Sequence, residues 1–362
     1  MVAPDRNFDQ AAAAARLLPT GMTSPRVVTV LGAYGHTGRF VVAELRRRGW
    51  TPVLAGRDAG RLERLGAAYP GLERRQASID TPASLDRALA GAAAVIHCAG
   101  PFAGTAGPVI EAALRARIHY LDVTAEVEVA AAAFAHADRA RDAGIVVLPA
   151  MAFYGGLGDL LATAAMAEWP TADEICLAYA LDSWKPTAGT RATAQTSKQR
   201  RSGRRLVFAN QRLELRTDAA PIAEWTFPPP IGRQTVVAEF TTADSVTIPR
   251  HLATAELRSY MTLAPLQDLA DPDTPPPVAI DDTGRSSQTF LVEAVVRRAG
   301  AERRAVARGR DIYAITAPLV VEALQRVVGG QIAVTGVVTA GQIFPARDFL
   351  AALAPHLAFE LG

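Results

Sequence analysis

Three glycines spaced three residues apart, Gly32, Gly35 and Gly38, are the residues of this 362-residue sequence with the clearest chemistry. They lie between a strand-like and a helix-like apolar run, in "VTVLGAYGHTGRFVVAEL". In such a turn the first glycine permits a tight bend, the second admits a pyrophosphate, and the third lets the helix pack against the strand. The helix N-terminus then offers free N–H groups to the phosphates. The pattern predicts a dinucleotide cofactor; the alternative is a glycine turn without a ligand.

The end of the next apolar run, in "VLAGRDAGR", indicates which dinucleotide is bound. NAD-binding sites usually place a carboxylate there to hold the ribose 2′-hydroxyl, whereas this sequence has Gly56 and Arg57. A guanidinium pairs with a 2′-phosphate, and Arg61 one helical turn later adds a second contact. We therefore expect NADP(H) rather than NAD(H); the alternative is that Arg57 caps a surface helix and Asp58 holds the ribose. From the glycine turn, the residues expected to contact the cofactor are Gly32, Tyr34, Gly35, His36, Thr37 and Gly38.

The elements that must position these residues alternate regularly between residues 26 and 150. The expected strands are "RVVTVLG", "TPVLAG", "RRQASI", "AAVIHCAG", "IHYLDV" and "GIVVLPA". The expected helices are His36–Gly49, Arg57–Leu65, Thr81–Ala90, Gly107–Ala116 and Glu126–Ala143. Short apolar strands that alternate with helices are typical of a doubly wound parallel sheet covered on both faces.

Beyond residue 150 the expected strands become longer and alternate polar with apolar residues, as in "EICLAYALDS" and "SQTFLVEAVVRRAG". This alternation is typical of a sheet with one solvated face. We therefore expect a second α+β domain, built on a mainly antiparallel or mixed sheet. Two proline-rich segments, "WTFPPPIG" and "DLADPDTPPPVAIDDTG", are expected to be connectors.

Several segments together resemble the saccharopine dehydrogenase-like NAD(P)-binding family, which includes saccharopine reductases and related trans-acting enoyl reductases. They are "LAGRDAGRLERL", "VIHCAGPFAGTAGPVIEAALRARIHYLDVTAE" and "GIVVLPAMAFYGGLGDLLA". The resemblance is strong over residues 26–161 and weak from there to about residue 335. Its most specific parts are "GPF" at Gly100–Phe102 and the pattern Y-x-D-x-T-x-E at Tyr120–Glu126.

The resemblance implies a division of the chain into four parts. A flexible N-terminal extension (1–24) precedes a Rossmann NAD(P)-binding domain (25–150). A substrate and dimerisation domain (151–330) follows, and a C-terminal segment (331–362) packs back on the Rossmann domain. The protein is then expected to form a homodimer.

The resemblance also implies positions around the cofactor. "CAGPF" would lie along the nicotinamide ribose and diphosphate, and Asp80 would lie near the adenine. The residues implied by "CAGPF" are Ala99, Gly100, Pro101 and Phe102, and those expected to face the cleft beside the nicotinamide are Tyr120, Asp122, Thr124 and Glu126. The chain has Ala125 and "MAFYGGLGD" where the family often has a glycine and a G-F-D-S-like turn, so no substrate identity is carried over.

Hydride transfer requires a positioned proton donor or acceptor, and the candidates are Asp122, Tyr154 and Tyr120. Asp122 is suited to protonating an imine nitrogen; the alternatives are that it caps a helix or binds cofactor hydroxyls. Tyr154 is suited to donating to a carbonyl, or else serves only in packing. No tyrosine is followed four residues later by lysine, which excludes the short-chain dehydrogenase dyad.

The overall composition restricts partners and compartment. A net charge of +2 argues against nucleic acid or a membrane surface as partner, and no apolar run is long enough to cross a bilayer. Two cysteines are too few for a disulfide framework or a cysteine zinc site, so we expect a cytoplasmic protein without a metal. The basic segment Thr187–Leu206 is expected to be a solvated loop or a mobile lid that attracts an anionic substrate.

The sequence therefore predicts an NADP(H)-dependent oxidoreductase that acts on a small-molecule substrate. Hydride transfer at a C=N or C–N bond is the first choice, through the resemblance. The alternatives are an NADPH-dependent enoyl or carbonyl reductase in a biosynthetic pathway, and an NADP-binding regulator without catalysis.

Overall fold

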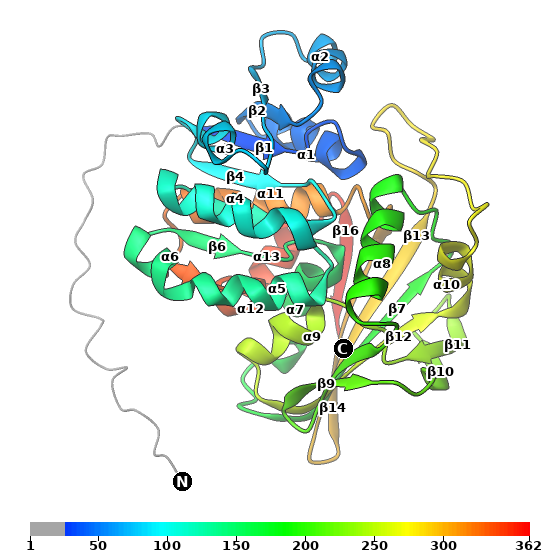
Figure 1. Ribbon diagram of the computed structural model, residues 1–362. Helices are drawn as coiled ribbons and strands as arrows, with labels where there is room; N and C mark the ends of the chain where they lie inside the picture. The colour runs from blue at the N-terminus through cyan, green and yellow to red at the C-terminus, as the bar shows by residue number, and fades with distance from the viewer. Residues whose placement is uncertain (1–25) are drawn as a thin grey trace.

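Two β-sheets lie side by side, each accompanied by helices, the first at the left of Figure 1 and the second at the right. The structure, a computed structural model, describes residues 26–362, and the expected N-terminal extension at residues 1–24 lies outside them. The first sheet is entirely parallel and the second is mixed, so the expected fold class is confirmed.

The first sheet consists of seven short strands whose residues are mostly buried, and the apolar runs of the sequence predict all of them except the two-residue strand at Gly336–Val337. In spatial order they are β15 (Gly336–Val337), β6 (Val146–Leu148), β5 (His119–Asp122), β4 (Ala94–His97), β1 (Val27–Leu31), β2 (Thr51–Gly56) and β3 (Arg74–Gln76). The chain moves outward from β1 through β2 to β3 and then returns to β4 on the other side of β1. The strand order therefore reverses between β1 and β4, and such a switch point is where open α/β sheets bind ligands.

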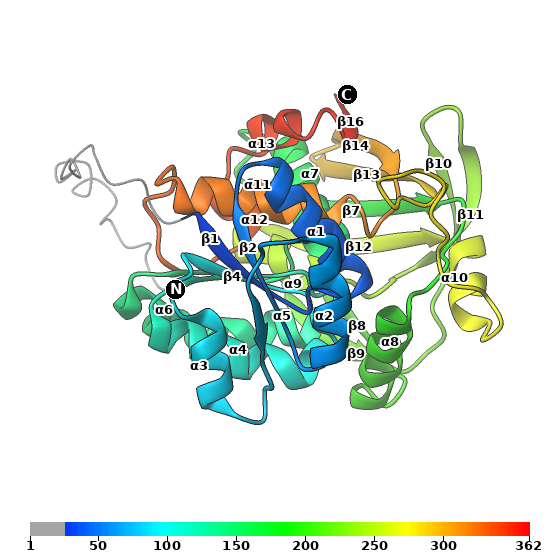
Figure 2. The ribbon, with the colours of Figure 1, turned by 90° about the horizontal axis from the view of Figure 1, so that it is seen from above.

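Helices cover both faces of this sheet (Figure 2). One face carries α3 (Pro82–Leu89), α4 (Phe102–Ala116) and α6 (Ala137–Ala143), with α5 (Val127–Ala133) beside α4. The other carries α1 (His36–Arg47), α2 (Ala59–Ala68) and α11 (Thr316–Val328). Although α11 comes from the second half of the chain, it packs on α1, where Arg48 and Glu322 form a 2.5 Å ion pair. The two halves of the protein thus share one hydrophobic core.

Two helices of the first half differ from the sequence prediction. The fourth helix begins at Phe102 and not at Gly107, because the Glu126 carboxylate accepts hydrogen bonds from the first backbone N–H groups. The long helix expected at Glu126–Ala143 is interrupted by a 3₁₀ turn at Phe134–His136, which separates α5 from α6.

The second sheet has nine strands, and only its β7–β12 pair is parallel. Its main order is β10 (Ile222–Phe227), β11 (Gly232–Ala238), β12 (Thr254–Thr262), β7 (Ala172–Leu181), β13 (Thr289–Arg298), β14 (Ala301–Arg310) and β16 (Leu357–Leu361). A hairpin of β8 (Arg205–Ala209) and β9 (Arg212–Arg216) attaches to β12. One face of the sheet packs on α7 (Gly158–Met166), which in turn contacts α12 (Ala340–Ile343) and α13 (Ala346–Ala352).

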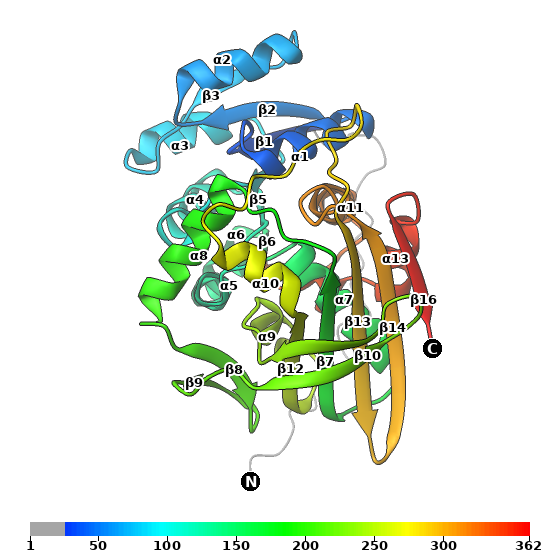
Figure 3. The ribbon, with the colours of Figure 1, turned by 90° about the vertical axis from the view of Figure 1, so that its right-hand side faces the viewer.

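The β10–β11 hairpin crosses the other face of this sheet, as Figure 3 shows. The expectation that "WTFPPPIG" is only a connector is wrong for its first three residues, which end β10. They form a strand because Trp225 and Phe227 are buried against the sheet, and the Trp225 indole N–H donates to Glu293 at 2.8 Å.

The expectation that the basic segment Thr187–Leu206 is a solvated loop is wrong, because most of it forms a helix, α8 (Ala188–Arg200), beside the first domain (Figure 3). The Thr187 side chain caps it by accepting from the Thr190 N–H. The C-terminal segment joins both sheets, because β15 pairs with β6 and β16 pairs with β14.

Candidate functional site

The glycine turn between β1 and α1 has no space for larger residues at two positions. Gly32 has a φ of +88°, and a Cβ atom on it would lie 2.8 Å from the Ala99 backbone nitrogen at the end of β4. A Cβ on Gly38 would lie 2.2 Å from the Gly32 carbonyl oxygen. These close approaches require glycine whether or not a ligand binds, so the glycines alone do not identify a phosphate site.

The N-terminus of α1 supplies the more informative observation. Its N-cap residue, Gly35, has no side chain to cap the helix, and the first turn contains no acidic residue. Asp58 caps α2, Thr187 caps α8 and Glu126 caps α4, whereas α3, α6 and α11 resemble α1 in having no side-chain cap at their N-termini. The backbone N–H groups of His36 and Thr37 therefore have no capping acceptor, which is the arrangement that binds a phosphate group.

Positive charge accompanies this helix end at the carboxyl end of β2. Arg57 and Arg61 are exposed there, and the Arg61 guanidinium carbon lies 4.9 Å from the centre of the Tyr34 ring. The Tyr34 ring covers Gly56, where a Cβ atom would lie 2.5 Å from it.

The carboxylates of Asp58 and Asp80 each accept a hydrogen bond within the protein. Asp58 accepts from the Arg61 backbone N–H at 2.8 Å as the cap of α2, and its own N–H donates to the Tyr34 hydroxyl. This carboxylate caps α2 through one oxygen, and whether its other oxygen holds a ribose stays open. Asp80 is exposed and accepts from the Ser78 hydroxyl at 3.1 Å.

Asp122 lies at the end of β5 and is completely buried. Its carboxylate accepts hydrogen bonds from the Tyr120 hydroxyl at 2.8 Å, the Thr124 N–H at 3.0 Å and the Ala150 N–H at 2.8 Å. Burial raises the pKa of Asp122 to about 6. The prediction that Tyr120 and Asp122 face the cleft has to be corrected, because both side chains are fully enclosed and bond to each other.

Thr124 and Glu126 continue this internal network. The Thr124 hydroxyl accepts from the Glu126 N–H at 3.0 Å, and both side chains are buried. The Glu126 carboxylate accepts from the Phe102 N–H at 2.7 Å and the Ala103 N–H at 3.0 Å, and burial raises its pKa. These contacts fix the "CAGPF" segment against the end of β5, so Thr124 and Glu126 also position backbone and do not face an open cleft.

An aromatic cluster lies where the two sheets meet. Tyr154 belongs to the turn before α7, and its ring centre lies 5.5 Å from that of Trp184 and 5.2 Å from that of Tyr179. Its hydroxyl is buried without a hydrogen-bond partner among the described residues, and burial raises its pKa well above the usual value. The tyrosine that the sequence proposed as a donor is therefore protonated at neutral pH, and its O–H group has no acceptor within residues 26–362.

Tyr313 connects this cluster to the glycine turn. Its ring meets the His36 ring edge-on at 5.1 Å, and its hydroxyl contacts Thr190 at 2.9 Å and the Trp184 indole at 3.1 Å. Sequence reasoning missed Tyr313 and Trp184, since both lie in irregular segments with no motif.

Helix α8 covers the "CAGPF" segment but is held by few contacts. Ser197 is its only buried residue. A Cβ on Gly100 would lie 3.2 Å from the Thr193 Oγ1, and the Arg191 guanidinium donates to two carbonyls of the 271–274 loop. Helix α8 is therefore held over this segment mainly by polar contacts at its surface.

Within residues 26–362, no group of histidine, cysteine, aspartate or glutamate side chains is arranged to hold a metal ion. The same residues contain no helix with the length and apolar character required to span a membrane.

Comparison with known proteins identifies the first domain. Residues 28–148 match the family model described as "Saccharopine dehydrogenase NADP binding domain". A sequence search of curated proteins found no match.

Comparison with solved structures shows the fold that both domains share with a known protein. The apo saccharopine dehydrogenase (L-Glu forming) of Saccharomyces cerevisiae superposes with a TM-score of 0.64 and 12% identity, over 93% of this chain and 99% of that one. GenD2 from gentamicin A biosynthesis, in complex with NAD, gives a TM-score of 0.44 and 13% identity, over 93% and 94% of the two chains. The first of these likenesses shows a shared two-domain fold.

Proposed function

We propose that this protein uses NADP(H) to transfer hydride at a carbon–nitrogen bond. It is an NAD(P)-dependent oxidoreductase, and its first domain matches the NADP-binding domain of the saccharopine dehydrogenase family. Its substrate is then a small metabolite that carries an imine or a secondary amine. The observation that supports the cofactor is the uncapped α1 terminus together with two exposed guanidinium groups, and the carbon–nitrogen bond is proposed from the likeness to saccharopine dehydrogenase.

The residues present fit a bound NADP(H). The N–H groups of His36 and Thr37 are available to the diphosphate, and Arg57 and Arg61 to the 2′-phosphate. Two exposed guanidinium groups stand against one carboxylate, that of Asp58, whose Oδ1 accepts from the Arg61 N–H in the cap of α2. This charge balance favours NADP(H) over NAD(H), since an acidic residue at the end of β2 would repel the extra phosphate.

When bound, the nicotinamide supplies or accepts the hydride, so the protein has to orient the substrate, exclude water and provide a proton. We assign the proton to Tyr154. Its hydroxyl is protonated, has no partner among the described residues, and lies in an aromatic cluster that excludes water. We assign Asp122 a positioning role, because its two oxygens already accept three hydrogen bonds.

A substrate screen tests this proposal. The purified protein is incubated with NADPH and cyclic imines, aldehyde–amine mixtures, enones or ketones, and the loss of reduced nicotinamide is followed by absorbance. Turnover confined to compounds with a C=N bond is expected. Turnover of enones or ketones alone would replace the imine assignment with enoyl or carbonyl reduction. NADPH binding without turnover of any compound would favour the non-catalytic regulator.

The matched variants are Tyr154→Phe and Tyr260→Phe. Tyr260 is also buried, but it packs beneath the β10–β11 hairpin, on the face of the second sheet away from α7. Loss of turnover in the first variant only is expected, and equal turnover in both would exclude Tyr154 as the proton donor.

A further inference from the structure

The turn that carries Tyr154, residues 150–157, has an unusual backbone conformation at two positions. Ala150 has a φ of +57°, which is strained for a residue with a Cβ atom, and Gly155 has a φ of +108°. A Cβ atom on Gly155 would lie 2.6 Å from the Ala150 carbonyl oxygen, so the two positions approach each other closely. Such a backbone persists only where the surrounding structure holds it, and strain of this kind is concentrated at functional sites.

Each of these two positions is held by a buried carboxylate. The Ala150 N–H donates to Asp122 at 2.8 Å, and the Gly155 N–H donates to Asp244 at 3.1 Å. Both carboxylates are completely enclosed. The chain is therefore fixed by hydrogen bonds before and immediately after Tyr154. Asp122 belongs to the motif in the first domain, whereas Asp244 comes from a position 89 residues after Gly155.

Asp244 begins the short helix α9 (Asp244–Thr247) and has no cation beside it. Its second oxygen accepts from the Tyr179 hydroxyl at 2.7 Å, and it forms no salt bridge with any arginine, lysine or histidine among residues 26–362. Burial raises the pKa of Asp244 to about 6. A buried charge without a paired cation is unfavourable for folding, and perturbed carboxylates of this kind gather at functional sites. Its place beside Tyr154 therefore indicates a role in the same site.

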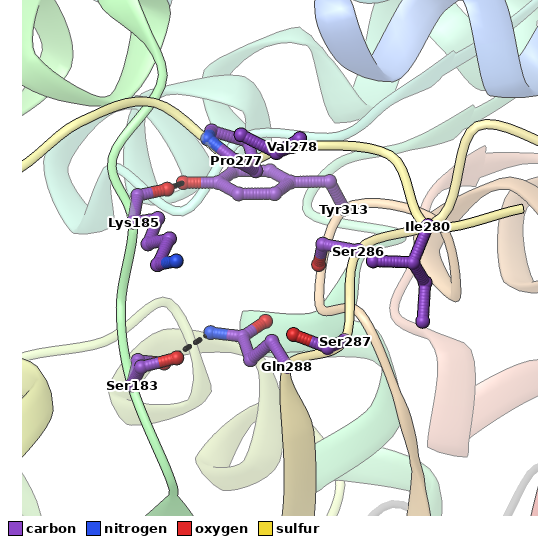
Figure 4. Close-up of a pocket in the computed structure, with 9 residues that line it drawn as sticks. All are labelled: Ser183, Lys185, Pro277, Val278, Ile280, Ser286, Ser287, Gln288 and Tyr313. Atoms are coloured by element: carbon purple, nitrogen blue, oxygen red, sulfur yellow. Dashed lines mark hydrogen bonds between the residues drawn. The ribbon is translucent and has the colours of Figure 1, made fainter.

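The Tyr154 ring is fixed by packing. Its centre lies 5.5 Å from that of Trp184 and 5.2 Å from that of Tyr179. Trp184 is held in turn, because its indole N–H donates to the Tyr313 hydroxyl at 3.1 Å. Tyr313 also lines a cavity of about 130 Å³ with Lys185, and its hydroxyl contacts the Lys185 carbonyl at 3.3 Å (Figure 4). With the rings packed in this way, the direction of the Tyr154 hydroxyl depends on where the backbone of its turn lies.

We propose that Asp244 is a positioning residue for Tyr154, which holds the turn so that the unpartnered Tyr154 hydroxyl is directed at the substrate. The proposal rests on the proposed function for the role of Tyr154 as proton donor. Asp244 itself supplies no proton to the substrate, because both of its oxygens accept hydrogen bonds within the protein. Its effect on turnover therefore passes through Tyr154.

Hydrogen exchange tests whether Asp244 holds the turn, without a requirement for a substrate. Peptides that span residues 150–157 are followed by mass spectrometry in the native protein, Asp244→Ala and Asp244→Asn. We expect exchange to be about tenfold or more faster in Asp244→Ala, because the Gly155 N–H loses a charged acceptor. Asp244→Asn is expected to exchange at close to the native rate, because the amide oxygen of asparagine can still accept from Gly155.

Glu293→Ala is the matched control. Glu293 is also completely buried, but it accepts from the Trp225 indole at 2.8 Å and from Arg304 at 2.7 Å, on the face of the second sheet that the β10–β11 hairpin covers. Its loss removes a buried carboxylate without touching the Tyr154 turn. Exchange at residues 150–157 is therefore expected to be unchanged in this variant.

A double-mutant cycle tests whether Asp244 acts through Tyr154. The value of kcat is measured with NADPH and the compound that the native protein reduces fastest among the imines, enones and ketones of the substrate screen. Asp244→Ala is expected to lower kcat about 10- to 100-fold, with the NADPH dissociation constant unchanged. In the Tyr154→Phe background the same substitution is expected to cause no further loss, because the donor that it positions is already absent. Asp244→Asn is expected to retain most of the native kcat.

Three outcomes would overturn the proposal. They are unchanged exchange at residues 150–157 in Asp244→Ala, an equal rise of that exchange in Glu293→Ala, and an equal fall of kcat in Asp244→Ala with and without the Tyr154 hydroxyl. If Asp244→Ala does not fold, Tyr179→Phe replaces it, since it removes only the hydroxyl that holds the second oxygen of Asp244. Unchanged exchange and kcat in Tyr179→Phe would then overturn the proposal. A native protein that reduces no compound of the screen would refute the proposed function, while the exchange result still decides whether Asp244 holds the turn.

Discussion

Replacing Asp122 with asparagine removes a buried charge and keeps the shape of the side chain. In the native protein this carboxylate is fully enclosed, and burial raises its pKa from 3.8 to about 6. The folded protein then binds more protons than the unfolded chain between these pH values. The contribution of Asp122 to stability is complete below pH 3.8 and is lost as the pH rises through 6.

The size of this effect follows from the shift of the pKa. A shift of about two units corresponds to a loss of about 3 kcal/mol in the free energy of unfolding. Of this loss, about 2 kcal/mol falls between pH 4.5 and pH 7.5. The Asp122→Asn protein cannot titrate at this position. As the pH rises from 4.5 to 7.5, the free energy of unfolding of the native protein should therefore fall by about 2 kcal/mol relative to that of the variant.

Urea unfolding of both proteins at several pH values measures this difference. Asp244 also has a pKa raised by burial to about 6, but it is present in both proteins and cancels in the comparison. Unfolding free energies of the two proteins that run parallel from pH 4.5 to 7.5 would refute the conclusion that burial raises the pKa of Asp122 despite its hydrogen bonds.

Four further substitutions have definite expected results. Tyr154→Phe should lower kcat by about 10²- to 10⁴-fold in stopped-flow assays, with the NADPH dissociation constant unchanged. Gly38→Ala should destabilise the fold by about 1–3 kcal/mol in urea and weaken NADPH binding, because the new methyl group meets the Gly32 carbonyl; Gly104→Ala, where nothing lies within 4 Å, should be stabilising. Glu126→Ala should cost about 1–3 kcal/mol and increase hydrogen exchange in the first turn of α4, because two backbone N–H groups lose their acceptor. Unchanged exchange there would contradict the capping role.

Features that depend on residues close together in the sequence could be predicted. The glycine turn and six of the seven strands of the first sheet follow from local patterns, because a tight bend and a short buried strand are recognisable from a few consecutive residues. The two-residue strand β15 could not be predicted, because only its pairing with β6 defines it. The start of α4 could not be predicted in the same way. Its capping residue, Glu126, comes 24 positions after Phe102, and only the fold brings the two together.

The roles of individual side chains were harder to predict. Asp122 lies at the end of a strand, where catalytic groups are common. The Tyr120 hydroxyl and the Ala150 N–H, which follows the neighbouring strand β6, nevertheless enclose its carboxylate. Helix α8 was missed as a helix because it buries only Ser197 and so lacks an apolar face. Lys185 and Tyr313 meet at one cavity from positions 128 residues apart, and no sequence pattern links them.

The central claim is that the turn between β1 and α1 holds NADP(H), with Arg57 on the 2′-phosphate. Calorimetric titration of the native protein and Arg57→Ala with NADPH and NADH tests it most directly. We expect NADPH to bind more tightly than NADH, and the variant to lose about 10- to 100-fold in NADPH affinity while its NADH affinity is unchanged. Equal loss for both nucleotides would contradict the role of Arg57, and binding of neither nucleotide by the native protein would contradict the cofactor site itself.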